Sequence, residues 1–141
     1  MRLQVMFGVA DDERDELNAL SNRIIGAALR VHTELGPGLL ESAYEVCLAF
    51  ELADEGCTIE RQVSVPIVYR RRKLVCGYRI DLLVERKVIV EVKAVDRLTP
   101  VHMAQLLSQL RLKDLKLGLL INFHVKSLRD GVRRVVNGFP D

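Results

Sequence analysis

GYRIDLLVERKVIVEVKAV, residues 77–95, has the pattern of two β-strands joined by a tight, charged turn. The second arm, VIVEVKAV, is almost wholly apolar, yet Glu91 and Lys93 lie inside it. Because side chains alternate between the two faces of a strand, Glu91 and Lys93 share one face with Ile89. The pattern therefore predicts a carboxylate and an ammonium group side by side in a run that otherwise has the apolar composition of a core strand.

A second carboxylate is expected directly across the hairpin. If the letters ERK form a three-residue turn, Val84 pairs with Val88, and Asp81 then lies opposite Glu91. Opposed Cβ atoms in such a ladder are roughly 4.5–5.5 Å apart. Two carboxylates at this separation repel each other unless a cation or a proton lies between them.

This spacing suits a divalent metal ion. Mg²⁺ prefers oxygen ligands and usually keeps several waters, so one or two carboxylates are enough to hold it. Lys93 would lie within reach of a metal-bound water or of a phosphate oxygen, an arrangement that suits metal-assisted hydrolysis of a phosphodiester. The alternative is an exposed salt bridge of Asp81 with Lys93 or Arg79 on a solvated face of the sheet, which is the common fate of charged residues on strands.

The regions before the hairpin predict two helices and a strand. Apolar residues recur at steps of three and four over residues 16–35, GPG at 36–38 ends this helix, and a second helix is expected at 40–55. Residues 58–69, TIERQVSVPIVY, have the alternating β-branched pattern of a strand. Pro66 within it predicts an edge strand or a bulge, because proline donates no ladder hydrogen bond.

After the hairpin, Thr99 and Pro100 predict the cap and first residue of a helix that reaches Asp114. Residues 116–123 then predict a fully buried strand. The expected order is ααβββαβ with a short tail, which indicates an α/β (α+β) fold with a mixed β-sheet flanked by helices. The domain would span residues 16–138, between an N-terminal extension at 1–15 and a C-terminal tail at 139–141.

The composition narrows the class of protein. With 141 residues, 49% hydrophobic and 28% charged, the chain has the totals of one globular domain. Its three cysteines have no C-x-x-C spacing, which favours reduced thiols in a cytoplasmic protein. No apolar run is long enough to span a bilayer, so we expect no membrane partner.

Two basic clusters could contact nucleic acid, although the net charge is only +2. Each cluster is equally well explained as a solvated turn. The expected nucleic-acid contacts are Arg70, Arg71, Arg72, Lys73, Arg133 and Arg134.

Asp81 followed by Glu91-Val92-Lys93 resembles the D…E-x-K signature of the PD-(D/E)xK nuclease superfamily. GLLESAY, which contains Gly38, Glu41 and Tyr44, is similar to the G-x-x-E-x-x-Y motif of a small bacterial family within that superfamily. The later PVHMAQLLSQLRLKDLKLGLLINF resembles the helix and buried strand of the same family. The resemblance covers nearly the whole chain and implies a restriction-endonuclease-like core.

The resemblance also implies a role for each site residue. Asp81 and Glu91 would bind Mg²⁺ or Mn²⁺ with the main-chain carbonyl of Val92, and Glu41 would approach the ion or its water from a helix. Lys93 would assist the attacking water. The remaining assignments are Gln105 near the Lys, Gly38 as a motif residue and Tyr44 as a packing residue. At position 109 relatives tend to carry an aromatic residue, whereas this chain has Gln.

The sequence thus predicts a cytoplasmic, metal-dependent nuclease that acts on DNA rather than RNA. The alternative is a module that binds nucleic acid or protein and keeps the nuclease fold without turnover. A purely structural subunit is a second alternative, which a large exposed apolar patch would indicate. One small domain covers little of a duplex, so a homodimer is compatible with this reading.

Overall fold

The structure, a computed structural model, describes the backbone of residues 2–140 and the side chains of residues 12–140. Its helices are α1 (Arg2–Leu35), α2 (Glu41–Asp54), α3 (Pro100–Lys113) and a short 3-10 helix, η1 (Leu128–Gly131). Its strands are β1 (Ile59–Ser64), β2 (Ile67–Tyr69), β3 (Arg72–Leu74), β4 (Arg79–Val84), β5 (Val88–Lys93), β6 (Leu117–Asn122) and β7 (Val132–Val136).

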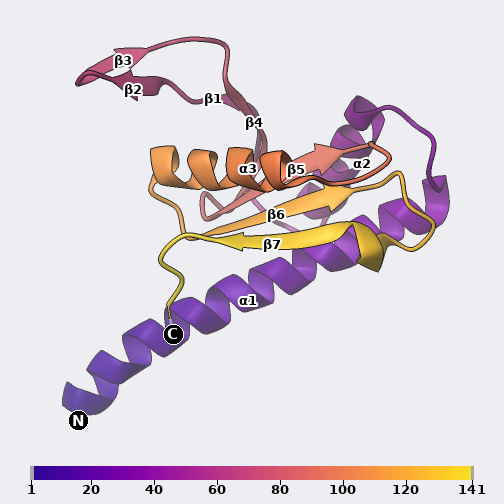
Figure 1. Ribbon diagram of the computed structural model, residues 1–141. Helices are drawn as coiled ribbons and strands as arrows, with labels where there is room; N and C mark the ends of the chain where they lie inside the picture. The colour runs from indigo at the N-terminus through magenta and orange to yellow at the C-terminus, as the bar shows by residue number, and fades with distance from the viewer. Residues whose placement is uncertain (1, 141) are drawn as a thin grey trace.

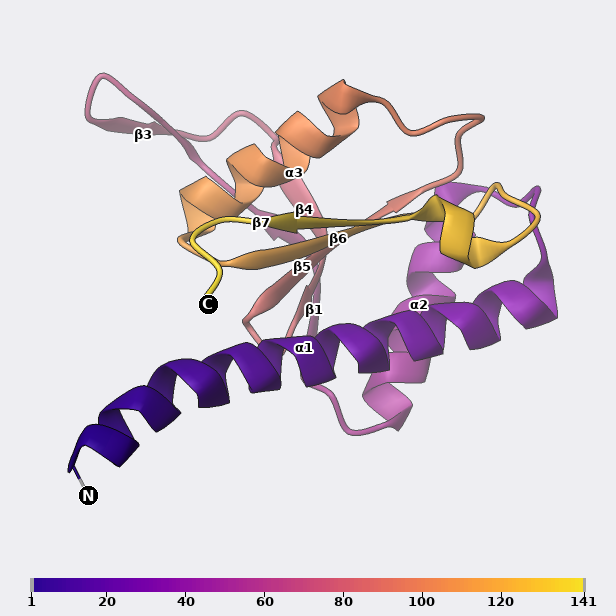
Figure 2. The same cartoon turned by 60° about the horizontal axis from the view of Figure 1, so that its bottom comes forward.

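A five-stranded mixed sheet forms the centre of the fold. Its strand order is β1-β4-β5-β6-β7, with β5 and β6 parallel and the other neighbours antiparallel. Helix α3 covers one face, and α1 and α2 cover the other (Figure 1; Figure 2). This arrangement confirms the expected mixed sheet flanked by helices and is consistent with a restriction-endonuclease-like fold.

Each face of the sheet has its own hydrophobic core. Val88, Val90 and Val92 of β5 pack toward α1 and α2, whereas Ile89 of the same strand packs with Leu106 and Leu110 of α3. The alternation of β5 is therefore the one predicted from its sequence. It leaves Glu91 and Lys93 on the face that α3 covers.

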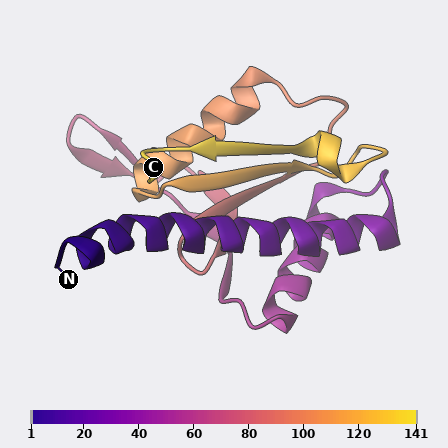
Figure 3. The same cartoon turned by 90° about the horizontal axis from the view of Figure 1, so that it is seen from below.

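Helix α1 begins earlier than predicted. The apolar periodicity marks a helix from residue 16, but the helix starts at Arg2 and its first turns run beyond the sheet (Figure 3). Periodicity reports only the part of a helix that packs on a core, so it could not mark this segment. Glu13 pairs with Lys116 at 2.7 Å, which ties the helix to the start of β6. Met1 and Asp141, the ends of the expected extension and tail, lie outside the described residues.

The expected strand at 58–69 is two strands in different sheets. Pro66 separates β1, an edge strand of the main sheet, from β2, which among residues 2–140 pairs only with β3. The edge position agrees with the proline, which cannot donate to a ladder. Strand β3 was not predicted, because the run of basic residues at 70–73 indicates a turn. The β2–β3 hairpin projects away from the body of the molecule (Figure 1).

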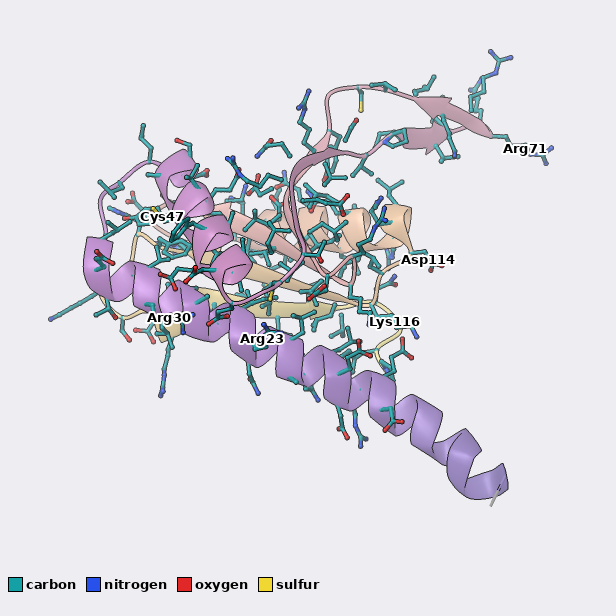
Figure 4. The ribbon with its side chains drawn as sticks, turned by 180° about the vertical axis from the view of Figure 1, so that it is seen from behind. Arg23, Arg30, Cys47, Arg71, Asp114 and Lys116 are labelled. Carbon is teal, nitrogen blue, oxygen red and sulfur yellow. The ribbon has the colours of Figure 1, made fainter. Side chains whose placement is uncertain are left out.

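Helices α1 and α2 are held together by charge and by one buried aromatic residue. Arg30 of α1 pairs with Glu51 at 3.0 Å and with Glu55 (Figure 4). Tyr44 of α2 is buried and stacks on Phe123 with ring centroids 4.5 Å apart. Its hydroxyl donates to the carbonyl of Gly36 at 2.5 Å, so this tyrosine packs in the core and fixes the loop between the helices. Within residues 2–140, no helix combines the length and apolar character needed to cross a membrane.

Candidate metal and catalytic site

Strands β4 and β5 separate at Asp81 and Glu91. The ladder pairs Val84 with Val88 and continues to Leu82 and Val90, which is the register expected for a three-residue turn. Beyond it the side chains take over the hydrogen bonding. The main-chain N–H of Asp81 donates to Oε1 of Glu91 at 3.2 Å, and the N–H of Val92 donates to Oδ2 of Asp81 at 2.9 Å. Each acid therefore lies in the gap between the two strands.

Glu91 is the more deeply placed acid. It is only 7% exposed. Burial, together with the negative charge of Asp81, raises the pKa of Glu91 to about 8. The shift favours the protonated form of this carboxyl group, and a shared proton is one of the two ways in which neighbouring carboxylates avoid repulsion.

Lys93 lies half-buried at the end of β5. Its positive charge lowers the pKa of Glu91, but burial and the charge of Asp81 raise that pKa by more. Among residues 12–140, Asp81 forms no ion pair with Lys93 or with Arg79. The alternative of an exposed salt bridge on a solvated face is therefore wrong, because Glu91 is buried and Asp81 bonds to the main chain.

Glu45 of α2 is a second buried acid beside the hairpin, and sequence reasoning missed it. Its Oε2 accepts hydrogen bonds from Arg61 at 2.9 and 3.2 Å, and its Oε1 accepts one from Gln62 at 2.8 Å. Burial raises the pKa of Glu45, and the negative charge of Asp81 raises it further. The hydrogen bond from Arg61 lowers this pKa, but by less than burial raises it. The same Gln62 amide lies 3.5 Å from Oδ1 of Asp81, so it joins the two acids.

The position of Gln62 depends on a break in the β1–β4 ladder. Arg61 pairs with Leu82 and Val63 with Ile80, whereas Gln62 has a left-handed φ of 53°. A non-glycine residue in this region is strained and persists only where its surroundings hold it. Here the amide of Gln62 bonds to Glu45 and approaches Asp81, which accounts for the conformation.

Glu41, the helix acid expected from the G-x-x-E-x-x-Y motif, is the first residue of α2 and is half-buried. Within the described residues it makes no hydrogen bond or ion pair. Glu45 follows it by four residues, one turn later on the same side of the helix. The signal that could have found Glu45 is its spacing with Leu48 and Leu52, which places a carboxylate on the buried face of α2.

The two glutamines of α3 differ in burial. Gln105 is exposed, and its main-chain carbonyl accepts a hydrogen bond from the Tyr78 hydroxyl at 3.3 Å. Gln109 is 4% exposed and lies against Glu91 and Tyr78, lowering the pKa of both. Its Oε1 has no hydrogen-bond partner within the described residues. Gln109 therefore faces the hairpin acids, whereas Gln105 faces solvent.

His102, in the first turn of α3, caps this helix. Its Nδ1 accepts a hydrogen bond from the N–H of Thr99 at 3.0 Å. This contact satisfies one of the free donors at the beginning of the helix and gives the imidazole a structural role.

The basic residues fall into three separate places. Residues 70–73 form the exposed tip of the β2–β3 hairpin. Arg133 lines a hollow of about 230 Å³ with Arg97, next to the carboxyl ends of β5 and β6. Arg134 points to the other face of β7, where it donates to Asn18 at 2.7 Å and stacks on the ring of Phe139. Arg133 and Arg134 therefore do not form one surface.

The hairpin acids fit a metal ion that keeps much of its water. Among residues 12–140, no three His, Cys, Asp or Glu side chains lie close enough to form a complete ligand set. Asp81 and Glu91 offer hard oxygen donors without a paired cation, and the raised pKa of Glu91 reflects in part the repulsion from Asp81 that a cation between them would relieve. The donor set suits Mg²⁺ or Mn²⁺ and is poor for zinc.

A sequence model described as the PD-(D/E)XK nuclease superfamily matches residues 18–135, which include α2, the β4–β5 hairpin and α3. No curated protein and no solved structure matches the chain.

Proposed function

Because the chain belongs to the PD-(D/E)XK nuclease superfamily, we propose that it is a metal-dependent nuclease that hydrolyses phosphodiester bonds of DNA. One observation carries the proposal. Asp81 and Glu91 lie in the gap between β4 and β5, each bonded to the main chain of the opposite strand, and Lys93 follows two residues later. No structural salt bridge within the described residues accounts for these charges.

The cofactor would be Mg²⁺ or Mn²⁺, held by Asp81, Glu91 and the main-chain carbonyl of Val92, with Glu41 reaching it through water. When bound, the ion would supply positive charge next to the phosphate and lower the pKa of a bound water. The raised pKa of Glu91 supports this assignment, because a cation between the two acids relieves the repulsion that the proton otherwise relieves.

Lys93 would act on the attacking water or stabilise the charge that develops on the phosphate oxygens. Its half-buried ammonium lies on the same strand face as Glu91. Gln105, which is exposed on α3, would position the substrate or water near Lys93. The order of Gly38, Glu41 and Tyr44 further supports the narrower G-x-x-E-x-x-Y family.

The nucleic-acid contacts would come from the basic residues. Those at 70–73 are exposed, and Arg133 lies at the carboxyl end of β5 and β6, close to where Lys93 ends its strand. Arg134 donates a hydrogen bond to Asn18 and stacks on Phe139, so it has a structural role. A contact with nucleic acid would come in addition to that role. These contacts would be with the phosphate backbone and independent of sequence. The protein would act in the cytoplasm.

The outer face of α2 supports a homodimer. Leu40 and Phe50 are 78% and 68% exposed, and Val46 lies between them on the same helix. Two adjoining hollows of about 320 and 490 Å³ are lined mostly by apolar residues of α1, α2 and the loop between them, with Glu34 and Glu51 at the first. A contiguous apolar surface of this kind is typical of a protein interface. Light scattering of the purified chain would give the oligomer directly.

Cleavage of plasmid and single-stranded DNA in Mg²⁺, Mn²⁺ or EDTA tests the proposal. We expect cleavage with either metal, none in EDTA, and its loss on Asp81→Asn. Turnover that survives both chelation and Asp81→Asn would overturn the metal mechanism. DNA binding without metal-dependent cleavage would favour the alternative of a binding module that keeps the fold.

A further inference from the structure

The β2–β3 hairpin is a basic arm outside the main sheet. Its strands form their own two-stranded sheet and pair with no other strand of the described chain. Residues 62–80 contain five basic residues and no acidic residue. Arg71 lies at the tip, pointing away from the body (Figure 4). Among the described residues no acid pairs with residues 70–73, so four consecutive cations are available to a partner.

The cations of the arm point in more than one direction. Arg72 pairs with Tyr69 and Lys73 pairs with Val68, and neighbouring residues on a strand project to opposite faces. Arg72 and Lys73 therefore carry positive charge on the two faces of the ribbon, while Arg70 and Arg71 carry it at the end. A ribbon that lay flat on one phosphate strand would use only one of these faces. A ribbon between two phosphate strands would use both.

From this geometry, and resting on the proposed nuclease function, we propose that the β2–β3 arm enters the major groove of double-stranded DNA and holds the substrate by the phosphates on both sides. The major groove of B-form DNA is about 12 Å wide and admits a two-stranded β-ribbon. The major groove of A-form RNA is deep and too narrow for side chains to read. The arm therefore selects duplex DNA over duplex RNA and over single strands.

The base of the arm connects it to the site. Val65 is buried and its N–H donates to the carbonyl of Tyr78 at 2.9 Å, and Tyr78 lies against Gln109 beside Glu91. Arg71 precedes Asp81 by ten residues, which span about 33 Å at most when extended. The reach of about 33 Å is close to one helical turn of a DNA duplex. A groove bound by the tip of the arm therefore lies within one turn of the phosphodiester bond at Asp81.

Two arginines of this chain form a matched pair for the test. Arg71 and Arg86 both lie in hairpin turns with left-handed φ values, 65° and 57°. Replacing either with glycine removes one positive charge and relieves the same backbone strain. Arg86 lies in the β4–β5 turn, at the other end of β4 from the arm, and faces Glu60 at 3.7 Å.

The experiment measures fluorescence anisotropy of a labelled 30-base-pair DNA duplex, the matching RNA duplex and one DNA strand, in EDTA over a range of salt concentrations. We expect the DNA duplex to bind most tightly. Arg71→Gly should weaken that binding about 5–10-fold and lower the slope of log K against log salt by about 0.9, whereas Arg86→Gly should change neither. Hydrolysis of bis(4-nitrophenyl) phosphate in Mn²⁺ should be equal in Arg86→Gly and wild type, which shows that the control substitution leaves the site intact.

Equal duplex binding by Arg71→Gly and wild type would overturn the proposal, as would tighter binding of the single strand or of duplex RNA. A change of oligomer mass in Arg71→Gly, seen by light scattering, would also overturn it and assign the arm to a second copy of the chain. Because binding is measured without metal, it separates the two proposals: a wild type that binds through Arg71 and never cleaves contradicts only the nuclease function.

Discussion

Asp81 and Glu91 replace part of the sheet that they interrupt. Where β4 and β5 would exchange their next pair of main-chain hydrogen bonds, the N–H of Asp81 donates to Glu91 and the N–H of Val92 donates to Asp81. The two carboxylates are thus fixed by main-chain donors rather than by flexible side chains. A site fixed in this way is ordered before any cation binds, and metal binding requires little rearrangement of the protein.

Lys93→Ala should abolish most of the nuclease activity without unfolding the protein. An ammonium group that stabilises charge only in the transition state contributes about 10²–10³-fold to kcat. Plasmid cleavage in Mg²⁺ would measure the loss, and circular dichroism would show that the fold is kept. The control is Lys126→Ala, at an exposed lysine of the loop after β6. Activity within twofold of wild type in Lys93→Ala would remove this residue from the mechanism.

Glu91→Gln should stabilise the metal-free protein at alkaline pH. The folded-state pKa of about 8 exceeds the ordinary value of 4.5, so between these values only the folded protein holds the proton. Wild-type stability therefore falls as the pH rises from 4.5 to 8, because the unfolded chain binds fewer protons. Glutamine stays neutral and avoids this loss.

Urea unfolding in EDTA at pH 5 and pH 9 measures that effect. The advantage of Glu91→Gln over wild type should grow by on the order of 2–4 kcal/mol between these two pH values. Glu34→Gln, at an exposed position on α1, should show no such growth. An advantage that is equal at both pH values would mean that Glu91 is ionised throughout.

Substitutions of the two acids of α2 should have different effects, one on stability and the other on DNA cleavage. Glu45→Ala removes the buried partner of Arg61 and Gln62 and should lower the free energy of unfolding by about 1–3 kcal/mol. Glu41→Ala removes no such contact and should leave stability nearly unchanged while reducing cleavage. Urea unfolding and plasmid cleavage of both variants give the four values. Full activity in Glu41→Ala would move the role of helix acid to Glu45.

The β4–β5 hairpin could be predicted because its register depends only on residues that are close together in the sequence. A three-residue turn between two alternating strands fixes the register, and the register alone places Asp81 and Glu91 together. Glu45, Gln62 and Gln109 could not be found in this way. Each reaches the hairpin from another element, and nothing in the sequence states how α2 and α3 are rotated about their axes.

The β2–β3 arm could not be predicted for a different reason. Its turn consists of Arg70 and Arg71, both with left-handed φ, where the common hairpin turns have Asn-Gly or Asp-Gly. Without that signal, a run of basic residues has the appearance of a loop. The start of α1 was missed because a helix outside the core needs no apolar periodicity.

Gln109→Leu should leave stability unchanged or raise it, and should weaken metal binding at neutral pH. The buried Oε1 of Gln109 has no hydrogen-bond partner among residues 12–140, so an apolar side chain of similar size removes an unpaired polar atom. The amide of Gln109 lowers the pKa of Glu91, and its loss raises that pKa further, which makes the proton harder for a cation to displace. Thermal unfolding and Mn²⁺ titration at pH 7 and pH 9 measure the two effects. Equal weakening at both pH values would contradict the proton as the cause.

Calorimetric titration of Mn²⁺ into the metal-free protein tests the central claim most directly. In two buffers of different ionisation enthalpy at pH 7, wild type should bind Mn²⁺ and release close to one proton, because Glu91 must ionise to become a ligand. Asp81→Asn should bind at least tenfold more weakly, and Glu91→Gln should release no proton. Mn²⁺ binding that is unchanged in Asp81→Asn, or a wild type that binds no Mn²⁺, would contradict a metal site between these two acids.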